Sequence, residues 1–275
     1  MAATSDVVRN HYQADIKDQV DWLQKLNSTI DEIGKGPLAG GDLASLDQFH
    51  IGGLPATIEL ANRAGVQPGI KVLDAGSGLG GPARYLAETF DCEVVGIDLA
   101  PHYVALAEAL TQRAGLADKV SFRVGNLASL PFADGTFDLV WTQHVVMNIR
   151  DRNELYRELR RVLKPKGKLA FYDVLAADEG LQPHYPVPWA EAPEISFLLT
   201  EDETIASIEA SGFELLRWNN VTEQAMVWTA RQQASAAPAG LGLVVGPRLG
   251  HMVANFRRNL VESRVKLVMG IAEAR

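Results

Sequence analysis

Residues 72–81 read VLDAGSGLGG, and this stretch decides the fold. An apolar strand pattern over residues 70–73 runs into a glycine-rich turn, and a helix pattern follows over 82–89. Glycines let the backbone approach a ligand closely, and the N-terminus of the following helix offers free N–H groups. A second strand pattern over 93–97 ends at Asp98, where a carboxylate can accept hydrogen bonds from both hydroxyls of a ribose. The stretch therefore predicts a site for a nucleoside cofactor.

The glycines alone do not identify that cofactor. Gly76, Gly78 and Gly81 fit the spacing GxGxxG, which is also typical of dinucleotide-binding proteins. Asp74, however, stands at the mouth of the first strand, where its carboxylate would face the pyrophosphate of NAD with like charge. A carboxylate there suits a cationic ligand, such as the ammonium and sulfonium groups of S-adenosylmethionine. The sequence therefore favours S-adenosylmethionine over NAD.

Strand and helix patterns alternate over residues 70–174, which predicts a parallel sheet with helices on both faces. Ligands of such sheets bind beyond the carboxyl ends of the strands. We therefore expect Asp74, Asp98, Asn126 and Gln143 on one rim, although they are far apart in the sequence. The expected strands are 70–74, 93–98, 119–124, 137–141 and 168–174, and the expected helices are 82–90, 101–114 and 151–163.

The segments on either side of this alternation are less regular. Three prolines within residues 182–189 exclude regular structure there, because proline lacks an N–H donor. Thr200 and Glu203 have the spacing of a capping box at the start of a helix. The remaining expected elements are helices over 5–33, 55–64, 200–211 and 248–261, a partly helical stretch over 222–247, and a pair of strands over 213–218 and 265–271.

Further motifs follow in order along the chain. Residues 124–132 read VGNLASLPF and 137–141 read FDLVW. Residues 160–168 read RRVLKPKGK, a pattern that predicts the end of a helix and a turn before the next strand. With the glycine-rich turn, they make residues 45–275 resemble the class I S-adenosylmethionine-dependent methyltransferases. Within that superfamily the chain is similar to the small-molecule branch of sarcosine/dimethylglycine-, phosphoethanolamine-, tocopherol- and sugar-methylating enzymes. Residues 47–53, DQFHIGG, are most like the sarcosine/dimethylglycine members.

The resemblance implies an α/β fold with a Rossmann-like, seven-stranded methyltransferase sheet. Helices would cover both faces of the sheet, and the last strand would be antiparallel. It also implies a helical N-terminal lid over residues 1–45 and a methyltransferase domain over 46–275, with substrate-cap segments at about 176–200 and 222–260.

The resemblance further implies which residues hold the cofactor. Asn126 and Leu127 would face the adenine; many relatives carry Asp at the Asn126 position, but an amide can donate as well as accept a hydrogen bond. Residues 48–50 would cap the methionine end of the cofactor. The implied cofactor-binding residues are Gln48, His50, Asp74, Gly76, Gly78, Gly80, Asp98, Leu99, Asn126, Leu127 and Gln143.

Candidate residues for the reaction itself are fewer. His144 is a candidate general base because the pKa of free histidine lies near neutrality; the alternative is a structural histidine. Tyr12, Tyr185 and Trp189 are candidates for contact with the acceptor, and the alternative for each is a place in the hydrophobic core. Some O-methylating relatives carry paired histidines where this chain has Met147 and Asn148.

We therefore expect transfer of a methyl group from S-adenosylmethionine to a small molecule, with N-methylation of an amine slightly ahead of O- or C-methylation. The reaction needs no metal, and no ligand cluster at metal spacing is seen in the sequence. The alternatives are an NAD-linked oxidoreductase and a cofactor-binding protein without enzymatic activity.

The composition limits the partners and the cellular compartment that the sequence supports. The net charge of −8 opposes electrostatic binding to nucleic acid. No run of about 18 apolar residues predicts a membrane span. A single cysteine, Cys92, excludes an intramolecular disulfide and fits a reducing cytoplasm. We expect a cytoplasmic enzyme whose partner is its small-molecule acceptor, and the sequence leaves open whether it forms a homodimer.

Overall fold

A computed structural model describes residues 28, 38, 41–178, 180–234 and 248–275. The helix expected over 5–33, including Tyr12, therefore lies almost entirely outside the described residues. The same holds for residues 235–247 of the stretch expected to be partly helical.

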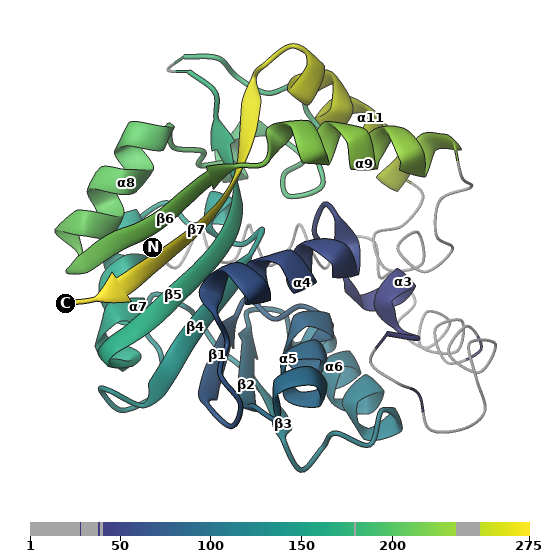
Figure 1. The fold of residues 1–275 in the computed structure, drawn as a ribbon. Helices are drawn as coiled ribbons and strands as arrows, with labels where there is room; N and C mark the ends of the chain where they lie inside the picture. Colours follow the sequence, from purple (N-terminus) through teal and green to yellow (C-terminus); the bar gives the residue numbers. More distant parts are fainter. Residues whose placement is uncertain (1–27, 29–37, 39–40, 179, 235–247) are drawn as a thin grey trace.

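Seven strands in the described part of the chain form one sheet, in the order β3-β2-β1-β4-β5-β7-β6 (Figure 1). Neighbouring strands from β1 to β5 are parallel, whereas β7 is antiparallel to both β5 and β6. This arrangement confirms the expected seven-stranded sheet with an antiparallel last strand. The strands are β1 (Lys71–Ala75), β2 (Glu93–Asp98), β3 (Val120–Val124), β4 (Phe137–Gln143), β5 (Leu163–Ala176), β6 (Phe213–Asn220) and β7 (Val265–Ala274).

Helices cover both faces of the sheet (Figure 1). Val72 and Leu73 are neighbours on β1, yet they pack into different hydrophobic cores, because successive side chains of a strand point to opposite faces. One core takes in α4 (Gly53–Ala64), α5 (Gly81–Phe90) and α6 (Pro101–Arg113), and the other takes in α7 (Arg152–Val162) and α8 (Glu201–Ala210). Both faces are thus buried, as is usual for parallel strands.

Two further helices lie beyond the sheet. α9 (Thr222–Ala234) and α11 (Leu249–Val261) pack against one another and against β7, and they lie together at the upper right of Figure 1. The remaining elements are the short helices α3 (Ala44–Asp47), η1 (Val146–Asn148) and η2 (Pro193–Ile195).

Capping residues in the sequence account for the starts of α7 and α8. The capping box predicted at Thr200 and Glu203 is present at the start of α8, where Thr200 accepts a hydrogen bond from the backbone N–H of Glu203. Asp151 caps α7 in the same way through the backbone N–H of Glu154.

One strand is longer than the sequence predicts. β5 begins at Leu163, whereas Pro165 and Gly167 predicted a turn before a strand over 168–174. Phe137 pairs with Leu163 and Leu139 pairs with Lys168, so residues 164–167 bulge out opposite a single residue of β4. The bulge carries the proline and glycine without ending the strand.

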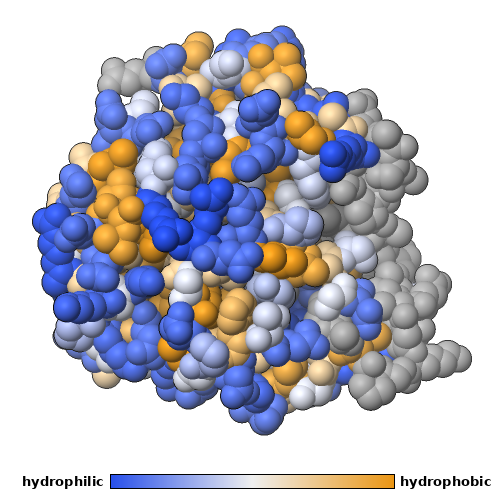
Figure 2. Space-filling view, in the orientation of Figure 1, coloured by the Kyte–Doolittle hydropathy of each residue, from blue (hydrophilic) through white to orange (hydrophobic). Residues whose placement is uncertain are grey.

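On the surface seen in Figure 2, hydrophobic residues form separate patches between hydrophilic residues. Among the described residues, no helix combines the length and the apolar character needed to cross a membrane.

Candidate functional site

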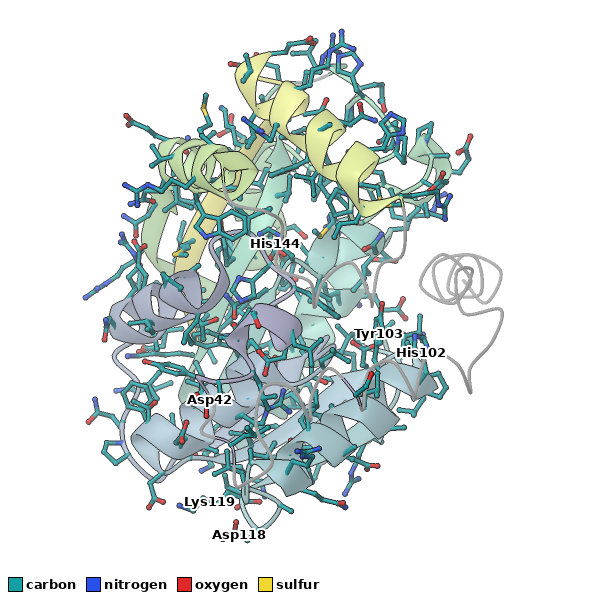
Figure 3. All side chains as sticks on the ribbon, turned by 90° about the vertical axis from the view of Figure 1, so that its right-hand side faces the viewer. Asp42, His102, Tyr103, Asp118, Lys119 and His144 are labelled. Atoms are coloured by element: carbon teal, nitrogen blue, oxygen red, sulfur yellow. The ribbon has the colours of Figure 1, made fainter. Side chains whose placement is uncertain are left out.

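A cavity of about 1720 Å³ opens at the carboxyl ends of the central parallel strands. Asp74, Asp98, Asn126 and Gln143 all line it, as expected from their places at or just beyond the carboxyl ends of four different strands. Figure 3 shows His144 in the interior of the molecule, with Asp118 and Lys119 at the opposite, lower end. The cavity is therefore where ligands of parallel α/β sheets bind.

The glycine-rich turn forms one wall of the cavity. The backbone N–H groups of Gly76 and Ser77 donate to the carbonyl oxygen of Ile97, at 2.8 and 3.1 Å, and this holds the turn against β2. Gly76 has a φ of 81°, and a Cβ there would lie 2.4 Å from a methyl carbon of Val145. The turn thus packs closely against Val145 at a position that only glycine fits.

Gly80 has a different place from the one the resemblance implies. It lies outside the cavity lining, at the start of α5, with a φ of 76°. A Cβ there would lie 2.4 Å from the ring of Phe122. In this structure Gly80 therefore allows the turn to pack against β3.

Two carboxylates face the cavity from β1 and β2. Oδ2 of Asp98 accepts from the N–H of Gly78 and Oδ1 accepts from the N–H of Ala100, both at 2.9 Å, which fixes the plane of this carboxylate. Oδ2 of Asp74 is buried and has no hydrogen-bond partner among the described residues. Burial, together with the charge of Asp98, raises the pKa of Asp74 to about 7.

A network of buried polar side chains connects β4 to α4 and to residues 48–50, which precede α4. The indole N–H of Trp141 donates to Oε1 of Gln143 at 2.8 Å, and the Thr57 hydroxyl lies 3.3 Å from the same oxygen. Thr57 also donates to Oε1 of Gln48 at 2.8 Å, and Nε2 of His50 lies 2.9 Å from that oxygen and 3.0 Å from the Thr57 hydroxyl. The Gln143 amide is thereby oriented, and its buried Nε2 has no partner in the described part of the chain.

An ion pair anchors the segment that carries Gln48 and His50. Arg84 on α5 donates to Oδ2 of Asp47 at 2.7 Å, and both side chains are fully buried. Arg84 also donates to Thr111 Oγ1 and to the Leu79 carbonyl oxygen. The sequence analysis did not identify Asp47, Arg84 or Thr57 as part of the site. The only signal for them in the sequence is Arg84, a charged residue on the otherwise apolar face of α5.

His144 comes directly after β4 and has a strained backbone conformation. Its φ is 54°, a left-handed value, and its backbone N–H donates to the Tyr172 carbonyl oxygen at 2.7 Å. Its ring centroid lies 4.6 Å from that of Tyr172 and 6.2 Å from that of His50. Nε2 of His144 is buried without a partner among the described residues.

Neither histidine is protonated at neutral pH. Burial lowers the pKa of His144 well below its ordinary value, and the nearby His50 adds to this effect. Burial also lowers the pKa of His50 to about 4. The cavity therefore presents neutral imidazoles at this point.

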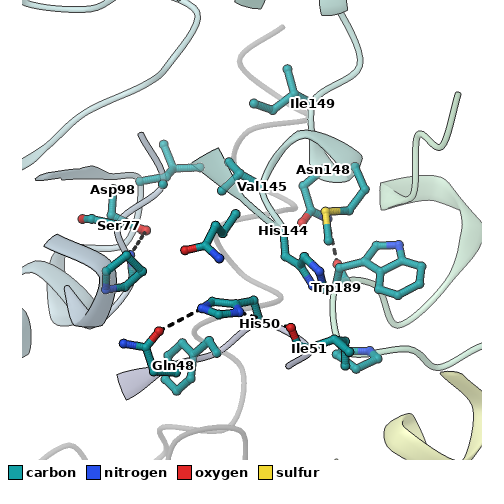
Figure 4. A pocket seen from close by; sticks show the side chains of 18 of the residues that line it. Gln48, His50, Ile51, Ser77, Asp98, His144, Val145, Asn148, Ile149 and Trp189 are labelled. Atoms are coloured by element: carbon teal, nitrogen blue, oxygen red, sulfur yellow. Dashed lines mark hydrogen bonds between the residues drawn. The ribbon is translucent and has the colours of Figure 1, made fainter. Parts of the chain in front are cut away.

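The structure places two of the candidate acceptor residues, Trp189 and Tyr185, in different cavities. Trp189 is buried, lines the cavity and donates from Nε1 to the Ser196 hydroxyl at 3.0 Å. Tyr185 lines a different, smaller cavity. Figure 4 shows His50 and His144 between Asp98 on one side and Trp189 on the other.

Within the described ranges, no group of three His, Cys, Asp or Glu side chains is arranged to hold a metal ion.

Comparisons with known proteins identify the family. Residues 73–171 match a family model described as a methyltransferase domain. The chain belongs to the class I S-adenosylmethionine-dependent methyltransferases. This confirms the family and the cofactor class predicted from residues 72–81 and Asp74.

Curated relatives of this methyltransferase differ in the chemistry that their names state. It is 33% identical over 162 residues to sterol 24-C-methyltransferase ERG6B of Gibberella zeae, covering 57% of this chain and 43% of that protein. It is 36% identical over 119 residues to glycine/sarcosine/dimethylglycine N-methyltransferase of Actinopolyspora halophila, covering 43% of this chain and 21% of that protein. The chain thus spans less than half the length of either relative.

Among solved structures, a geranyl diphosphate methyltransferase in complex with GPP and sinefungin superposes with a TM-score of 0.69. Its sequence is 20% identical, and the match covers 80% of this chain and 77% of that one. A likeness at this identity establishes the fold.

The residues present fit the cofactor of the family. The unpartnered oxygen of Asp74 suits a cation, and the unpartnered Gln143 amide suits an acceptor atom. The Asp98 oxygens retain lone pairs beyond those used by the two backbone N–H groups.

Proposed function

We propose that this chain transfers the methyl group of S-adenosylmethionine to a small-molecule acceptor. The observation that carries the proposal is the convergence of Asp74, Asp98 and Gln143 on one cavity whose next wall is formed by His144. When bound, S-adenosylmethionine supplies an electrophilic methyl group on a good sulfonium leaving group.

The chain's own residues would bind and orient the cofactor. Asp98 would hold the ribose, Asp74 would lie toward the cationic methionine end, and Gln143 would donate from its oriented amide. Gly76 and Gly78 would allow the close backbone approach. Gln48 and His50 would cap the methionine end, and Leu99, Asn126 and Leu127, which line the cavity beside Asp98, would border the nucleoside. Catalysis by such a site comes mainly from alignment and exclusion of water.

N-methylation of an amine is the first candidate for the acceptor chemistry. The burial that keeps both histidines neutral would equally disfavour a bound ammonium, because desolvation penalises any charged form. An amine held there would keep the free electron pair that attacks the methyl carbon, and it would need no general base.

O-methylation is the second candidate, favoured by the unpartnered Nε2 of His144. As the bond between oxygen and the methyl carbon forms and the bond between that carbon and sulfur breaks, Nε2 would take the hydroxyl proton. A neutral imidazole is in the right state for this step. C-methylation would require removal of a proton from carbon, for which the same nitrogen is available.

The test begins with calorimetric titration of the purified protein with S-adenosylmethionine, S-adenosylhomocysteine and NAD. We expect the first two to bind and NAD not to bind. Transfer of labelled methyl groups to matched panels of amines and hydroxyls then identifies the acceptor chemistry. Binding of NAD alone would support the oxidoreductase alternative, and cofactor binding without transfer to any acceptor would support a non-enzymatic protein.

The variant His144→Gln separates the two candidates. Loss of a general base lowers the rate by about 10²–10⁴-fold, so a hydroxyl acceptor should lose that much. An amine acceptor should lose far less. The affinity for S-adenosylhomocysteine should be unchanged in either case, which serves as the control for folding. An unchanged rate on a hydroxyl acceptor would remove His144 from the mechanism.

A further inference from the structure

The cavity extends well beyond the residues assigned to the cofactor. A second part, here called the acceptor lobe, is lined by Trp189, Trp228, Met252, Val253 and Phe256. Met252, Val253 and Phe256 lie on one face of α11, Trp228 belongs to α9, and the rings of Trp189 and Phe256 have centroids 5.9 Å apart. Figure 4 shows Trp189 on the side of His144 that is away from Asp98.

Two polar groups that border this lobe, the Trp189 indole and the Asn148 amide, have partners within the protein. Nε1 of Trp189 donates to the Ser196 hydroxyl, as described above. The Asn148 amide donates to the carbonyl oxygens of Trp189 and Ile195, at 2.7 and 3.0 Å. The lobe therefore offers a ligand mainly carbon surface, which favours apolar ligands.

The charged side chains that α11 brings to the lobe are arginines. Arg248, at the N-cap of α11, and Arg257, further along the helix, line the cavity, and Arg248 pairs with Glu191 at 2.7 Å. Among the described residues that line the cavity, no carboxylate comes from α9, α11 or the loop of Trp189. A buried ammonium without a carboxylate partner is strongly unfavourable. An aromatic ring such as that of Trp189 can stack on a cation, but the positive charge of Arg257 on the same wall would repel it.

The volume of the cavity is also consistent with a bulky ligand in the acceptor lobe. A site for one drug-sized ligand usually encloses about 300–1,000 Å³, and this cavity encloses about 1720 Å³. It therefore has room for a second ligand beside a cofactor, and that ligand can be considerably larger than an amino acid.

We propose that the acceptor carries its reactive group on a bulky, predominantly apolar body without positive charge, and that this body packs against α9 and α11. The methylation of this molecule rests on the proposed function, whereas its binding in the lobe does not. Small zwitterions such as sarcosine and dimethylglycine would be disfavoured as acceptors, because none of the described lining residues on α9, α11 or the loop of Trp189 offers a carboxylate to their ammonium group.

The test uses 1-aminoanthracene, an apolar fluorescent probe that is uncharged at neutral pH, added to the full chain saturated with S-adenosylhomocysteine. We expect saturable binding with a rise in fluorescence. In the variant Val253→Glu, which places a carboxylate on the lobe face of α11, the affinity for the probe should fall at least about tenfold.

A matched control lies on the same helix. Val261→Glu makes the same chemical change at a side chain that is 71% exposed and does not line the cavity, so the affinity for the probe should stay at the wild-type value. Calorimetry with S-adenosylhomocysteine should give the wild-type affinity for both variants, which shows that each is folded.

Three outcomes would overturn the inference: no binding of the probe, equal binding to the wild type and to Val253→Glu, or displacement of the probe by sarcosine or dimethylglycine. These outcomes are distinct from failure of the proposed function. If S-adenosylhomocysteine binds and the probe does not, only the acceptor class is wrong; if S-adenosylhomocysteine does not bind, the proposed function itself fails.

Discussion

The cofactor side and the acceptor lobe of the same cavity offer opposite kinds of surface. On the cofactor side, hydrogen-bonding groups are held in fixed positions: Asp98 is oriented by two backbone N–H groups and the Gln143 amide by Trp141. In the acceptor lobe, the polar atoms of Trp189 and Asn148 are bonded within the protein and apolar faces remain. The first side can recognise one ligand by directed bonds, whereas the second selects by size and by the absence of positive charge. One half can therefore change its ligand without disturbing the other.

The largest effect that would test this contrast is expected from Asp98→Ala. Hydrogen bonds to a charged group contribute about 1.5–3 kcal/mol each, so losing the two proposed ribose bonds should weaken S-adenosylhomocysteine about a hundredfold or more. Binding of 1-aminoanthracene to the acceptor lobe should be unchanged. Calorimetry measures the first value and fluorescence titration the second.

The matched control for Asp98→Ala is Glu93→Ala, at the exposed start of the same strand, which should bind S-adenosylhomocysteine as the wild type does. Equal affinity of Asp98→Ala and wild type would show that Asp98 does not hold the ribose. Loss of probe binding together with cofactor binding would show that the two halves of the cavity are not independent.

The same contrast explains what could be predicted from the sequence. Asp74, Asp98, Asn126 and Gln143 each lie at or just beyond the carboxyl end of a strand. Parallel strands bring these ends to one rim, so periodicity alone placed the four residues together. The antiparallel strands over 213–220 and 265–274 could likewise be predicted, once the resemblance supplied their pairing. Only the bulge at residues 164–167 was mistaken for a turn, because proline and glycine mark both features.

The rest depends on contacts between distant elements. Asp47 on α3 meets Arg84 on α5, and Thr57 on α4 meets Gln143 on β4, and neither pair leaves a periodic signal. In the proline-rich stretch over 182–189, Tyr185 and Trp189 looked equivalent in sequence. The structure directs Trp189 to the main cavity and Tyr185 to another one, and no local rule for irregular segments could have separated them.

A smaller effect is expected from pH, and it should be confined to the cofactor side. The pKa of Asp74 is raised to about 7, so its carboxyl is largely protonated below that pH. A cationic ligand prefers the ionised form, and binding below pH 7 must therefore release a proton. The affinity for S-adenosylmethionine should fall by about tenfold for each pH unit below about 7 and should be level above it.

Calorimetry in buffers of different ionisation enthalpy detects that proton directly. The variant Asp74→Asn should bind more weakly at high pH and should lose the pH dependence, which separates Asp74 from the neighbouring Asp98, whose pKa is also raised by burial. Binding of 1-aminoanthracene should not change over the same range. A level affinity from pH 5 to 8 in the wild type would contradict the placement of Asp74 beside a cation.

The smallest effect is expected from Thr57→Val, which removes a hydroxyl that never faces the ligand. Thr57 is fully buried and acts as a positioning residue, because its hydroxyl joins Gln48, His50 and Gln143. A neutral hydrogen bond contributes about 0.5–1.5 kcal/mol. Valine keeps the shape of the side chain but frees both amides to rotate, and S-adenosylhomocysteine should bind about three- to tenfold more weakly.

Thr57→Ser restores the hydroxyl and should recover most of that affinity, although it leaves a small cavity where the methyl group was. Calorimetry on the two variants, with thermal unfolding to compare their stability, decides between positioning and packing. If Thr57→Ser binds S-adenosylhomocysteine nearly as the wild type does and Thr57→Val binds it more weakly, the effect belongs to the hydroxyl. If Val binds as the wild type does and Ser is the weaker of the two, the methyl group matters rather than the hydrogen bonds, and the cofactor side would then resemble the acceptor lobe in depending on shape alone.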